Sequence, residues 1–405
     1  MTSPADPAAG TPAPAFRTGI CIHNRVLFAL MITATLAALT SGFVSLAPNR
    51  LISGRPIALW HAAGGISTAV VGVVAVALLA FSLAPPRKTL PAAAAVLAAV
   101  LLLLSLAVLG RAASIVAAAA GPAARVSAGA AFWIIASCAA LAVVDALQRL
   151  DAGPLPMLAV VIAIGGAIAG LALGGTFDML SIAREYSSRH ALFNAAITRH
   201  LALVAGSVGT ALVIGFPLGV AAARRPRLQG PLFAVLNLLQ TVPSIALFGL
   251  LIVPLAALAA AMPWLASLGV GGIGPAPAVI ALVLYGLLPI VRNTAAGLAG
   301  VSPAVIDAAR GMGLTQRQIF RRVELPLALP VLLAGLRIVL VQTIGLAVVA
   351  ALIGAGGLGT FVFEGLGQYA LDLVLLGALP AIFLALAADF VLHLLSALLP
   401  RQAAR

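Results

Sequence analysis

The chain has 405 residues, of which 63% are hydrophobic and 8% are charged, and its formal net charge is +13. A soluble domain has about 45–50% apolar and about 25% charged residues, so this composition excludes an ordinary soluble protein and indicates a membrane protein. The positive charge comes from 22 arginines and one lysine. Cys21 and Cys138 lie far apart and indicate neither a disulfide framework nor a metal site.

Ten apolar segments reach the length of about 20 residues that a membrane span needs. Their predicted limits are 26–46, 57–83, 90–110, 129–147, 155–175, 200–222, 232–260, 277–297, 327–352 and 373–399. The sequence therefore predicts an all-α integral membrane protein with about ten transmembrane helices. Residues 1–22 are rich in Ala, Pro, Thr and Ser and are predicted to be a disordered cytoplasmic tail. The basic start and the cleavage site of a signal peptide are not clear, so the first apolar segment is predicted to be a retained span.

The basic residues favour one orientation of these spans. With a cytoplasmic N-terminus, the inside segments hold 14 arginines and lysines and the outside segments hold 7. This bias predicts that both termini are cytoplasmic. Because the charge is spread over many short loops, nucleic acid is not an expected partner.

The chain divides near residue 176. Five Ala-rich spans form an N-terminal extension (23–175), and a polar segment (176–199) is predicted to be an external linker with an amphipathic helix. Five more spans, interrupted by Pro, Gly and amide residues, fill 200–399, and a short tail follows at 400–405. Gly166, Gly170 and Gly174 recur at four-residue spacing, which predicts close helix packing rather than a ligand site.

The segment 301–326 is predicted to form two short helices on the cytoplasmic surface, and we call it the elbow. Ser302 is expected to cap a helix that begins at Pro303 and ends near Gly313. Thr315 is expected to cap a second helix. Its polar face carries Arg317, Arg321 and Arg322, its other face carries Ile319 and Val323, and Pro326 begins the next span. Such a protruding, basic surface is suited to docking a partner.

The elbow resembles the cytoplasmic signature of binding-protein-dependent ABC importer permeases, which reads Glu-Ala-Ala, three residues, Gly, nine residues, Ile, one residue and Leu-Pro. The residues in register are Asp307, Ala308, Ala309, Gly313, Val323, Leu325 and Pro326, with Asp in place of Glu and Val in place of Ile. The flanking segments resemble the permeases for osmoprotectants such as glycine betaine, carnitine and choline. These segments are TVPSIALFGLLIVPL (241–255), ALVLYGLLPIVRNTAAGLAGVSPAVIDAARGMGL (281–314) and RVELPLALPVLLAGLRIVLVQTIGLAVVAALIGAGGLG (322–359).

The resemblance implies a type I ABC importer permease core at 200–399, in a transport subunit of the bacterial inner membrane that performs no chemistry itself. The matched residues, with Arg317 and Arg321, would contact a dimer of separate ATPase subunits, which would bind ATP and Mg²⁺; no cofactor or metal is expected in this chain. The other implied partners are an extracytoplasmic solute-binding protein, a second permease subunit (a copy or a paralogue) and membrane lipid. A permease for methionine or another amino acid-like solute is the alternative within this class.

Polar side chains within spans predict a translocation path, because each costs free energy in hydrocarbon unless it faces protein or water. Asn237, Gln240, Thr241 and Ser244 surround Pro243, and Gln342 and Thr343 lie in the span after the elbow. The two groups are predicted to face each other across the path, with simple interhelical hydrogen bonds as the alternative. A glycine-rich run resembles a dinucleotide fingerprint but lacks the required strand, so it is predicted to be an external turn or gate. Its glycines are Gly354, Gly356, Gly357 and Gly359.

Charged residues inside spans leave a second class of function open. Arg337 is predicted to reach an acidic residue or to line an inner vestibule, and Arg292 to extend toward the cytoplasmic interface. Asp389 and His393 lie one helical turn apart and predict a polar seam more readily than a proton relay. An ion-coupled carrier built from two five-span repeats is the alternative of another class, and a membrane scaffold without transport is a third. With only 3 Trp and 3 Tyr, tight recognition of a quaternary ammonium group is expected in the binding protein.

Overall fold

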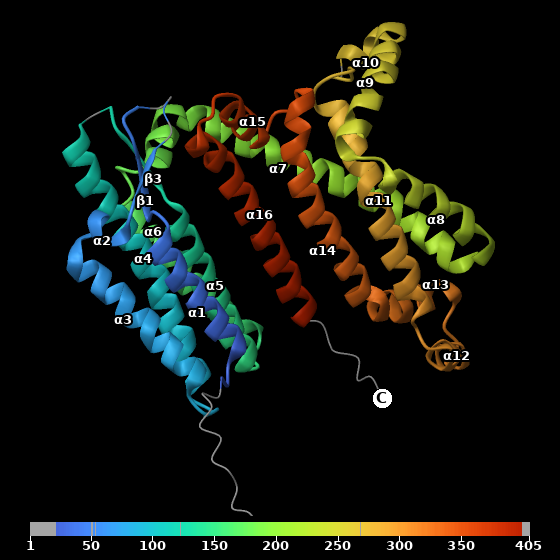
Figure 1. The fold of residues 1–405 in the computed structure, drawn as a ribbon. Helices are drawn as coiled ribbons and strands as arrows, with labels where there is room; N and C mark the ends of the chain where they lie inside the picture. The colour runs from blue at the N-terminus through green and yellow to red at the C-terminus, as the bar shows by residue number, and fades with distance from the viewer. Residues whose placement is uncertain (1–21, 50–51, 53, 122, 268, 399–405) are drawn as a thin grey trace, which may run out of the picture. The chain divides into compact units, whose positions relative to one another are not determined.

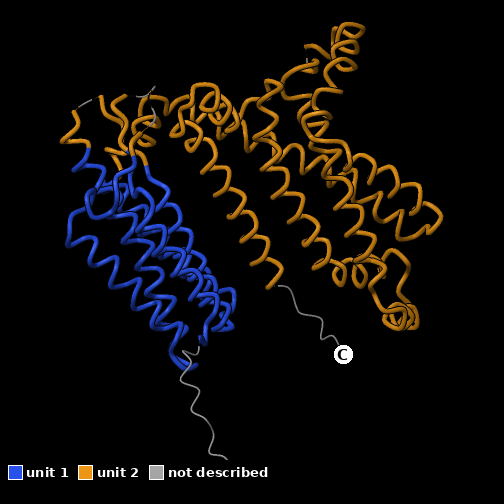
Figure 2. Tube along the Cα trace, in the orientation of Figure 1, with its two compact units in different colours: residues 1–45, 56–116, 128–176 blue, residues 46–55, 117–127, 177–405 orange. Residues whose placement is uncertain are grey.

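The computed structural model describes residues 22–49, 52, 54–121, 123–267 and 269–398, which are mainly helical (Figure 1). The chain forms two compact units (Figure 2). Unit 1 comprises 1–45, 56–116 and 128–176, and unit 2 comprises 46–55, 117–127 and 177–405. One boundary between the units lies between residues 176 and 177, and two segments of the first half, 46–55 and 117–127, belong to unit 2.

Unit 1 is built from the helices of the N-terminal half. These are α1 (Arg25–Thr40), α2 (Leu59–Ala62), α3 (Gly64–Leu83), α4 (Leu90–Ala120, of which the last turn lies in unit 2), α5 (Ala130–Arg149) and α6 (Pro154–Leu173). Helix α1 packs against α3 and α5, with Met31 fully buried. The first half of the chain also contains three short strands, which lie where the segments of the two units meet in the sequence. They are β1 (Val44–Ala47), β2 (Arg55–Ile57) and β3 (Arg125–Ala128), and they form a sheet of order β2-β1-β3.

Unit 2 contains the second half. Its elements are α7 (Ser181–Arg224), α8 (Pro226–Thr241), α9 (Ser244–Ala261), α10 (Pro263–Ser267), α11 (Pro275–Ala299), α12 (Pro303–Gly311), α13 (Gln316–Ile319), the π-helical segment η1 (Phe320–Glu324), α14 (Leu325–Val349), the 3₁₀ turn η2 (Ala350–Ile353), α15 (Gly359–Gly367) and α16 (Leu371–Leu398). Helix α11 packs against α7 and α14, and α14 packs against α16 (Figure 1). Leu282, Val291 and Val339 lie in the resulting hydrophobic core.

Glycine allows the closest approach within this core. A Cβ atom on Gly219 of α7 would lie 2.5 Å from the Cβ of Thr294 on α11. That distance is well inside van der Waals contact, so only a glycine lets the two helix backbones come this near. Thr294 itself is 2% exposed, which places the contact in the interior of the unit.

The predicted spans are largely confirmed. Nine helical segments of the described chain are long and apolar enough to cross a membrane, and they correspond to the second to tenth predicted spans. The first predicted span, 26–46, is too long: α1 has 16 residues and ends at Thr40, because Val44–Ala47 pairs as a strand. The seventh, 232–260, is divided into α8 and α9 at Val242 and Pro243, since a proline lacks the backbone N–H that a continuous helix needs.

The polar segment 176–199, predicted to be an external linker with an amphipathic helix, is largely helical. From Ser181 onward it forms the N-terminal part of the 44-residue helix α7, with a kink at Arg189. Ile182, Phe193 and Ala196 on this part pack against a cluster centred on Phe361 and Leu373. An apolar face therefore holds the segment within unit 2, and of its polar residues Ser181 and Glu185 are also buried.

Candidate functional site

The elbow has the two-helix form that the sequence predicts. Helix α12 begins at Pro303, and Gly313 follows it with a φ of 80°, in the left-handed region that favours glycine. Thr315 forms a capping box with Gln318 at the start of α13. The predicted cap at Ser302 is wrong in one respect: Ser302 occupies the N-cap position, but its side chain makes no capping hydrogen bond.

One face of the elbow is anchored and the other is exposed. Ala309 and Ile319 are each 1% exposed, and they fix the two helices on the protein. Ala308 is exposed, so of the two alanines in the signature only Ala309 packs within this chain. The exposed side chains include Asp307, Arg310, Arg317, Arg321 and Arg322.

The exposed face of the elbow also has an apolar element. Met312 is 74% exposed next to the Gly313 turn, and Val305 is 42% exposed. Asp307 and Arg310 form an ion pair of 2.9 Å, but both side chains are more than half exposed, so the pair adds little stability. A charged rim around a protruding methionine is a surface that can enter a cleft of another protein.

The elbow joins the membrane helix α14 through a π-helical segment. This segment, Phe320–Glu324, carries Glu324 at its end, and Glu324 is 2% exposed. Both guanidinium Nη atoms of Arg224, at the end of α7, donate to its two carboxylate oxygens, with an Nη1–Oε1 distance of 3.0 Å. The Arg224 guanidinium also lies 5.8 Å from the centre of the Phe320 ring. Val323 and Leu325 are half-buried on either side, and Pro326 is exposed.

The polar residues around Pro243 are bound mainly to α11. Gln240 donates to the backbone oxygen of Tyr285 at 2.6 Å, and the Tyr285 hydroxyl donates to the backbone oxygen of Val242. Asn237 accepts a hydrogen bond from Arg292 at 3.2 Å. The sequence predicts that Arg292 extends toward the interface, but it does not predict this partner. These bonds fix the break between α8 and α9 against α11.

The other predicted path residues lie on α8, α9 and α14. Thr241 donates to Leu238 of its own helix at 2.7 Å, and Ser244 is half-buried as the first residue of α9. On α14, Gln342 is half-buried and Thr343 is 2% exposed. The path between these two groups of residues remains a prediction.

The glycine run forms a turn that follows a 3₁₀ segment instead of a strand. It begins after η2 and leads into α15, with φ values of 78°, 78° and 84° at Gly354, Gly356 and Gly357. The guanidinium Nε of Arg199 donates to the Ala355 carbonyl at 3.1 Å. A Cβ on Gly359 would collide with the Val348 backbone oxygen. The turn is therefore fastened to α7 and α14, in agreement with the rejection of a dinucleotide site.

Two family models match the chain. Residues 24–183 match the model described as the N-terminal domain of the ABC transporter permease YehY, and residues 215–403 match the model described as the binding-protein-dependent transport system inner membrane component. The chain is 43% identical over 222 residues to the osmoprotectant import permease protein OsmW of Salmonella typhimurium, in an alignment that covers 55% of this chain and 98% of that protein. The chain belongs to the osmoprotectant-permease family of binding-protein-dependent ABC importers.

Other relatives of this permease lie in the same family. It is 39% identical to the carnitine transport permease protein OpuCB of Listeria monocytogenes, over 51% of this chain and 88% of that protein. It is 37% identical to the choline transport system permease protein OpuBB of Bacillus subtilis, over 48% and 82%. Among solved structures, a chain of the MetNI methionine ABC transporter aligns at 25% identity with a TM-score of 0.46, over 52% of this chain and 98% of that chain.

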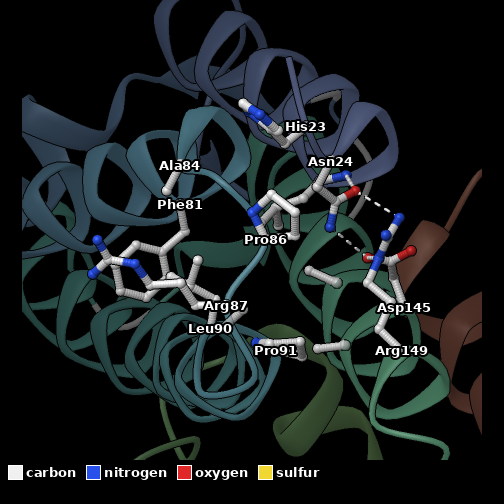
Figure 3. Close-up of a pocket in the computed structure, with 14 residues that line it drawn as sticks. His23, Asn24, Phe81, Ala84, Pro86, Arg87, Leu90, Pro91, Asp145 and Arg149 are labelled. Carbon is white, nitrogen blue, oxygen red and sulfur yellow. Dashed lines mark hydrogen bonds and ion pairs between the residues drawn. The ribbon is translucent and has the colours of Figure 1, made fainter. Parts of the chain in front are cut away.

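The N-terminal half of the permease contains a cavity of about 100 Å³ at the ends of α1, α3, α4 and α5 (Figure 3). Asp145 accepts hydrogen bonds from Asn24 at 2.9 Å and from Arg149 at 2.8 Å, and Arg149 also donates to Asn24 at 2.9 Å. Asn24 caps α1 as well. These three residues bind one another and thereby connect the start of α1 to α5, so we assign the polar side of the cavity a structural role. Within the described residues, no group of three or more His, Cys, Asp or Glu could hold a metal ion.

Of two interhelical ion pairs in the permease, the sequence predicts one in part and the other not at all. Arg224 and Glu324 are 100 residues apart, and no local pattern links them. Arg337 is predicted to reach an acidic residue, and it does: its guanidinium binds the Asp389 carboxylate. The sequence pairs Asp389 only with His393 along its own helix, because the contact across to α14 is not visible in the local pattern.

Proposed function

We propose that this permease imports a quaternary ammonium osmoprotectant such as glycine betaine, carnitine or choline, together with a separate ATPase and a separate extracytoplasmic binding protein. The elbow is the observation that carries the proposal. It anchors Ala309 and Ile319 inside the chain and exposes Asp307, Met312 and its arginines. The names of the relatives, which include osmoprotectant, carnitine and choline permeases, support the class of solute.

The coupling step follows from the way the elbow is attached. The elbow would dock in a cleft of the ATPase, and the closure of two ATPase subunits on ATP would move it. The π-helical segment would pass that movement directly into α14, and the Arg224–Glu324 pair would pass it to α7. Movement of two helices at once is what a rigid-body change of access requires. ATP and Mg²⁺ would be bound by the ATPase and not by this chain.

The assembly and orientation belong to the same proposal. A second permease subunit, either a copy or a paralogue, would complete the path, and both termini would be cytoplasmic, as the distribution of basic residues predicts. The elbow would then lie on the cytoplasmic side, where the ATPase binds. A methionine-type solute is the alternative within this class.

An ion-coupled carrier is less well supported. Such a carrier needs a carboxylate in the membrane that is available to exchange a proton, and Asp389 is its candidate. Asp389 instead accepts two hydrogen bonds from the Arg337 guanidinium, one on each carboxylate oxygen. A carboxylate that is bound in this way to a fixed cation is not the free exchange site that such a carrier needs.

Reconstitution tests the proposal. The permease would be placed in proteoliposomes with its proposed ATPase and binding protein, and uptake of labelled glycine betaine, carnitine, choline and methionine would be measured with and without ATP. ATP-dependent uptake of a quaternary ammonium solute is the expected result. Uptake by this chain alone, driven by an ion gradient, would overturn the proposal, and uptake of methionine only would replace the solute class.

A further inference from the structure

An ion pair lies inside the membrane-spanning part of unit 2. Arg337 of α14 donates from Nε and Nη2 to the two carboxylate oxygens of Asp389 on α16, with an Nη2–Oδ2 distance of 2.7 Å. Arg337 lies 12 residues after Leu325, the first residue of α14, which is about 18 Å along the helix at 1.5 Å per residue. Asp389 lies nine residues before the end of α16. Both charges are therefore well inside their helices.

Helix packing alone does not explain this pair. Apolar side chains of similar volume join two helices at least as well as a buried ion pair does. The pair is also not sealed between the helices, because the side chains of Arg337 and Asp389 are 43% and 37% exposed. Charged groups at this depth face a bundle interior or a water-filled cavity and mark pathways for solutes.

Polar residues continue from the pair toward the end of α16. His393 and Ser396 follow Asp389 at spacings of four and seven residues, so the three share one face of the helix. His393 is exposed, and Ser396 donates to the backbone oxygen of His393 at 2.7 Å. This face therefore carries polar side chains from the ion pair toward the helix end, in a helix whose other residues are mostly apolar.

We propose that Arg337 and Asp389 form a transient solute site, which holds a zwitterionic quaternary ammonium compound by exchanging partners. The proposal rests on the function proposed above. The solute carboxylate takes the place of Asp389 on the Arg337 guanidinium, which binds carboxylates through two parallel hydrogen bonds. The methylated ammonium group takes the place of Arg337 next to Asp389. The site stays electrically neutral when it is empty and when it is occupied.

The exchange of ion-pair partners makes binding of the solute weak, and weak binding is what a site on a transport path requires. A quaternary ammonium group has no N–H, so it attracts Asp389 by charge only and does not replace the two hydrogen bonds that Arg337 gave. The occupied state is therefore not much more stable than the empty one. A site on a path must bind a solute well enough to admit it and weakly enough to release it. High affinity would belong to the binding protein.

The two residues have different roles for different solutes. Glycine betaine and carnitine carry a carboxylate and need both residues. Choline carries only the cationic group, so it uses Asp389 and gains nothing from Arg337. Loss of Arg337 should therefore separate zwitterionic from cationic solutes, which loss of a purely structural contact would not do.

The test measures uptake of labelled glycine betaine and choline by the complete reconstituted importer, with ATP hydrolysis followed in the same vesicles. Arg337→Gln is expected to lower glycine betaine uptake at least about tenfold, the loss typical of a hydrogen bond to a charged group. It should leave choline uptake at or above the wild-type level, because choline then no longer competes with Arg337 for Asp389. Asp389→Asn is expected to lower uptake of both solutes. Arg292→Gln on α11 serves as the matched control and should affect the two solutes equally.

A neutral double variant controls for the possibility that the single variants misfold because one charge is left unpaired. Arg337→Gln with Asp389→Asn leaves no unpaired charge, and it should keep ATP hydrolysis stimulated by the binding protein while losing uptake of both solutes. Wild-type uptake by the double variant, or an equal loss of both solutes in Arg337→Gln, would overturn the proposed site. Failure of the wild-type importer to carry either solute would refute the function itself, which is a different result.

Discussion

Arg224 and Glu324 connect the end of α7 to the base of the elbow through a bidentate ion pair in which the carboxylate is almost completely buried. Glu324 is the last residue of a π-helical segment, and π-helical segments inside α-helices are frequent at functional sites. Among the residues that the structure describes, Arg224 is the one cation that pairs with this buried carboxylate. We therefore expect movement of the elbow to reach α7 through this side-chain contact.

The first prediction separates the coupling role of this pair from its effect on stability. Arg224→Met leaves the buried Glu324 carboxylate without its guanidinium and should lower the thermal unfolding midpoint in detergent. The loss in the free energy of unfolding should be smaller than the loss of about 3–5 kcal/mol that follows when one partner of a fully buried pair is removed, because the Arg224 side chain is 40% exposed. The double variant Arg224→Met with Glu324→Leu should regain the midpoint, since an apolar pair packs without a buried charge.

The same double variant is expected to lose coupling. Uptake and stimulated ATP hydrolysis should fall although the protein is stable and still binds the ATPase. Arg225→Met, a change at the neighbouring exposed arginine, is the control and should behave like the wild type. Wild-type coupling in the double variant would limit the pair to a structural role.

The second prediction concerns the turn of the elbow. Gly313 has a φ of 80°, and a Cβ at this position would meet no atom within 4 Å, so Gly313→Ala adds backbone strain without a steric clash. A left-handed alanine costs about 1–2 kcal/mol. We expect about tenfold weaker binding of the ATPase, measured by titration of the purified permease with its ATPase, and unchanged insertion into the membrane. Gly311→Ala, at a helical position that is equally open, should bind like the wild type; equal binding by both variants would contradict the docking role.

The third prediction concerns the break between α8 and α9. The Tyr285 hydroxyl donates to the Val242 carbonyl beside Pro243, and Tyr285→Phe removes this bond. The expected loss is about 1 kcal/mol, seen as a lower unfolding midpoint and faster proteolysis near Val242. Tyr369 is 96% exposed, so Tyr369→Phe should leave both quantities unchanged. If the two tyrosine variants do not differ, the hydroxyl bond does not fix the break.

The fourth prediction tests the close contact between α7 and α11. Gly219→Val places side-chain atoms against Thr294, where a Cβ alone would lie at 2.5 Å. Overpacking of this kind costs about 1–3 kcal/mol or more. The yield of monodisperse protein after detergent extraction and its unfolding midpoint should both fall. Gly206→Val on the same helix meets nothing within 4 Å at its Cβ, and it should extract normally.

A structural element can be predicted from the sequence where the residues that determine it all lie in the same segment. The apolar runs predict the nine long membrane helices of the described chain, and Pro303, Gly313 and Thr315 predict the shape of the elbow because each acts on its own backbone. The end of α1 cannot be predicted in this way, since Val44–Ala47 leaves the apolar run only because it pairs with distant strands.

The site is less predictable, because much of it depends on how helices rotate against one another. Gln240 is recognisable as a polar residue inside a span, yet its partner is a backbone oxygen of α11. Glu324 follows two exposed arginines in the sequence and is nevertheless buried against Arg224. Arg337 is more predictable, since its depth in the membrane alone requires an acidic partner or water.

The assignment of 46–55 and 117–127 to unit 2 has a practical consequence for protein engineering. Arg125 lies 3.7 Å from the buried Glu185 of α7, and Ser127 donates to Asp372 of α16 at 2.8 Å. A truncation that begins at residue 177 would delete both of these contacts together with the first half. Chimaeras between relatives should therefore take segments 46–55 and 117–127 from the donor of the permease core, because both segments belong to the same unit as the core. A single junction at residue 177 would separate them from it.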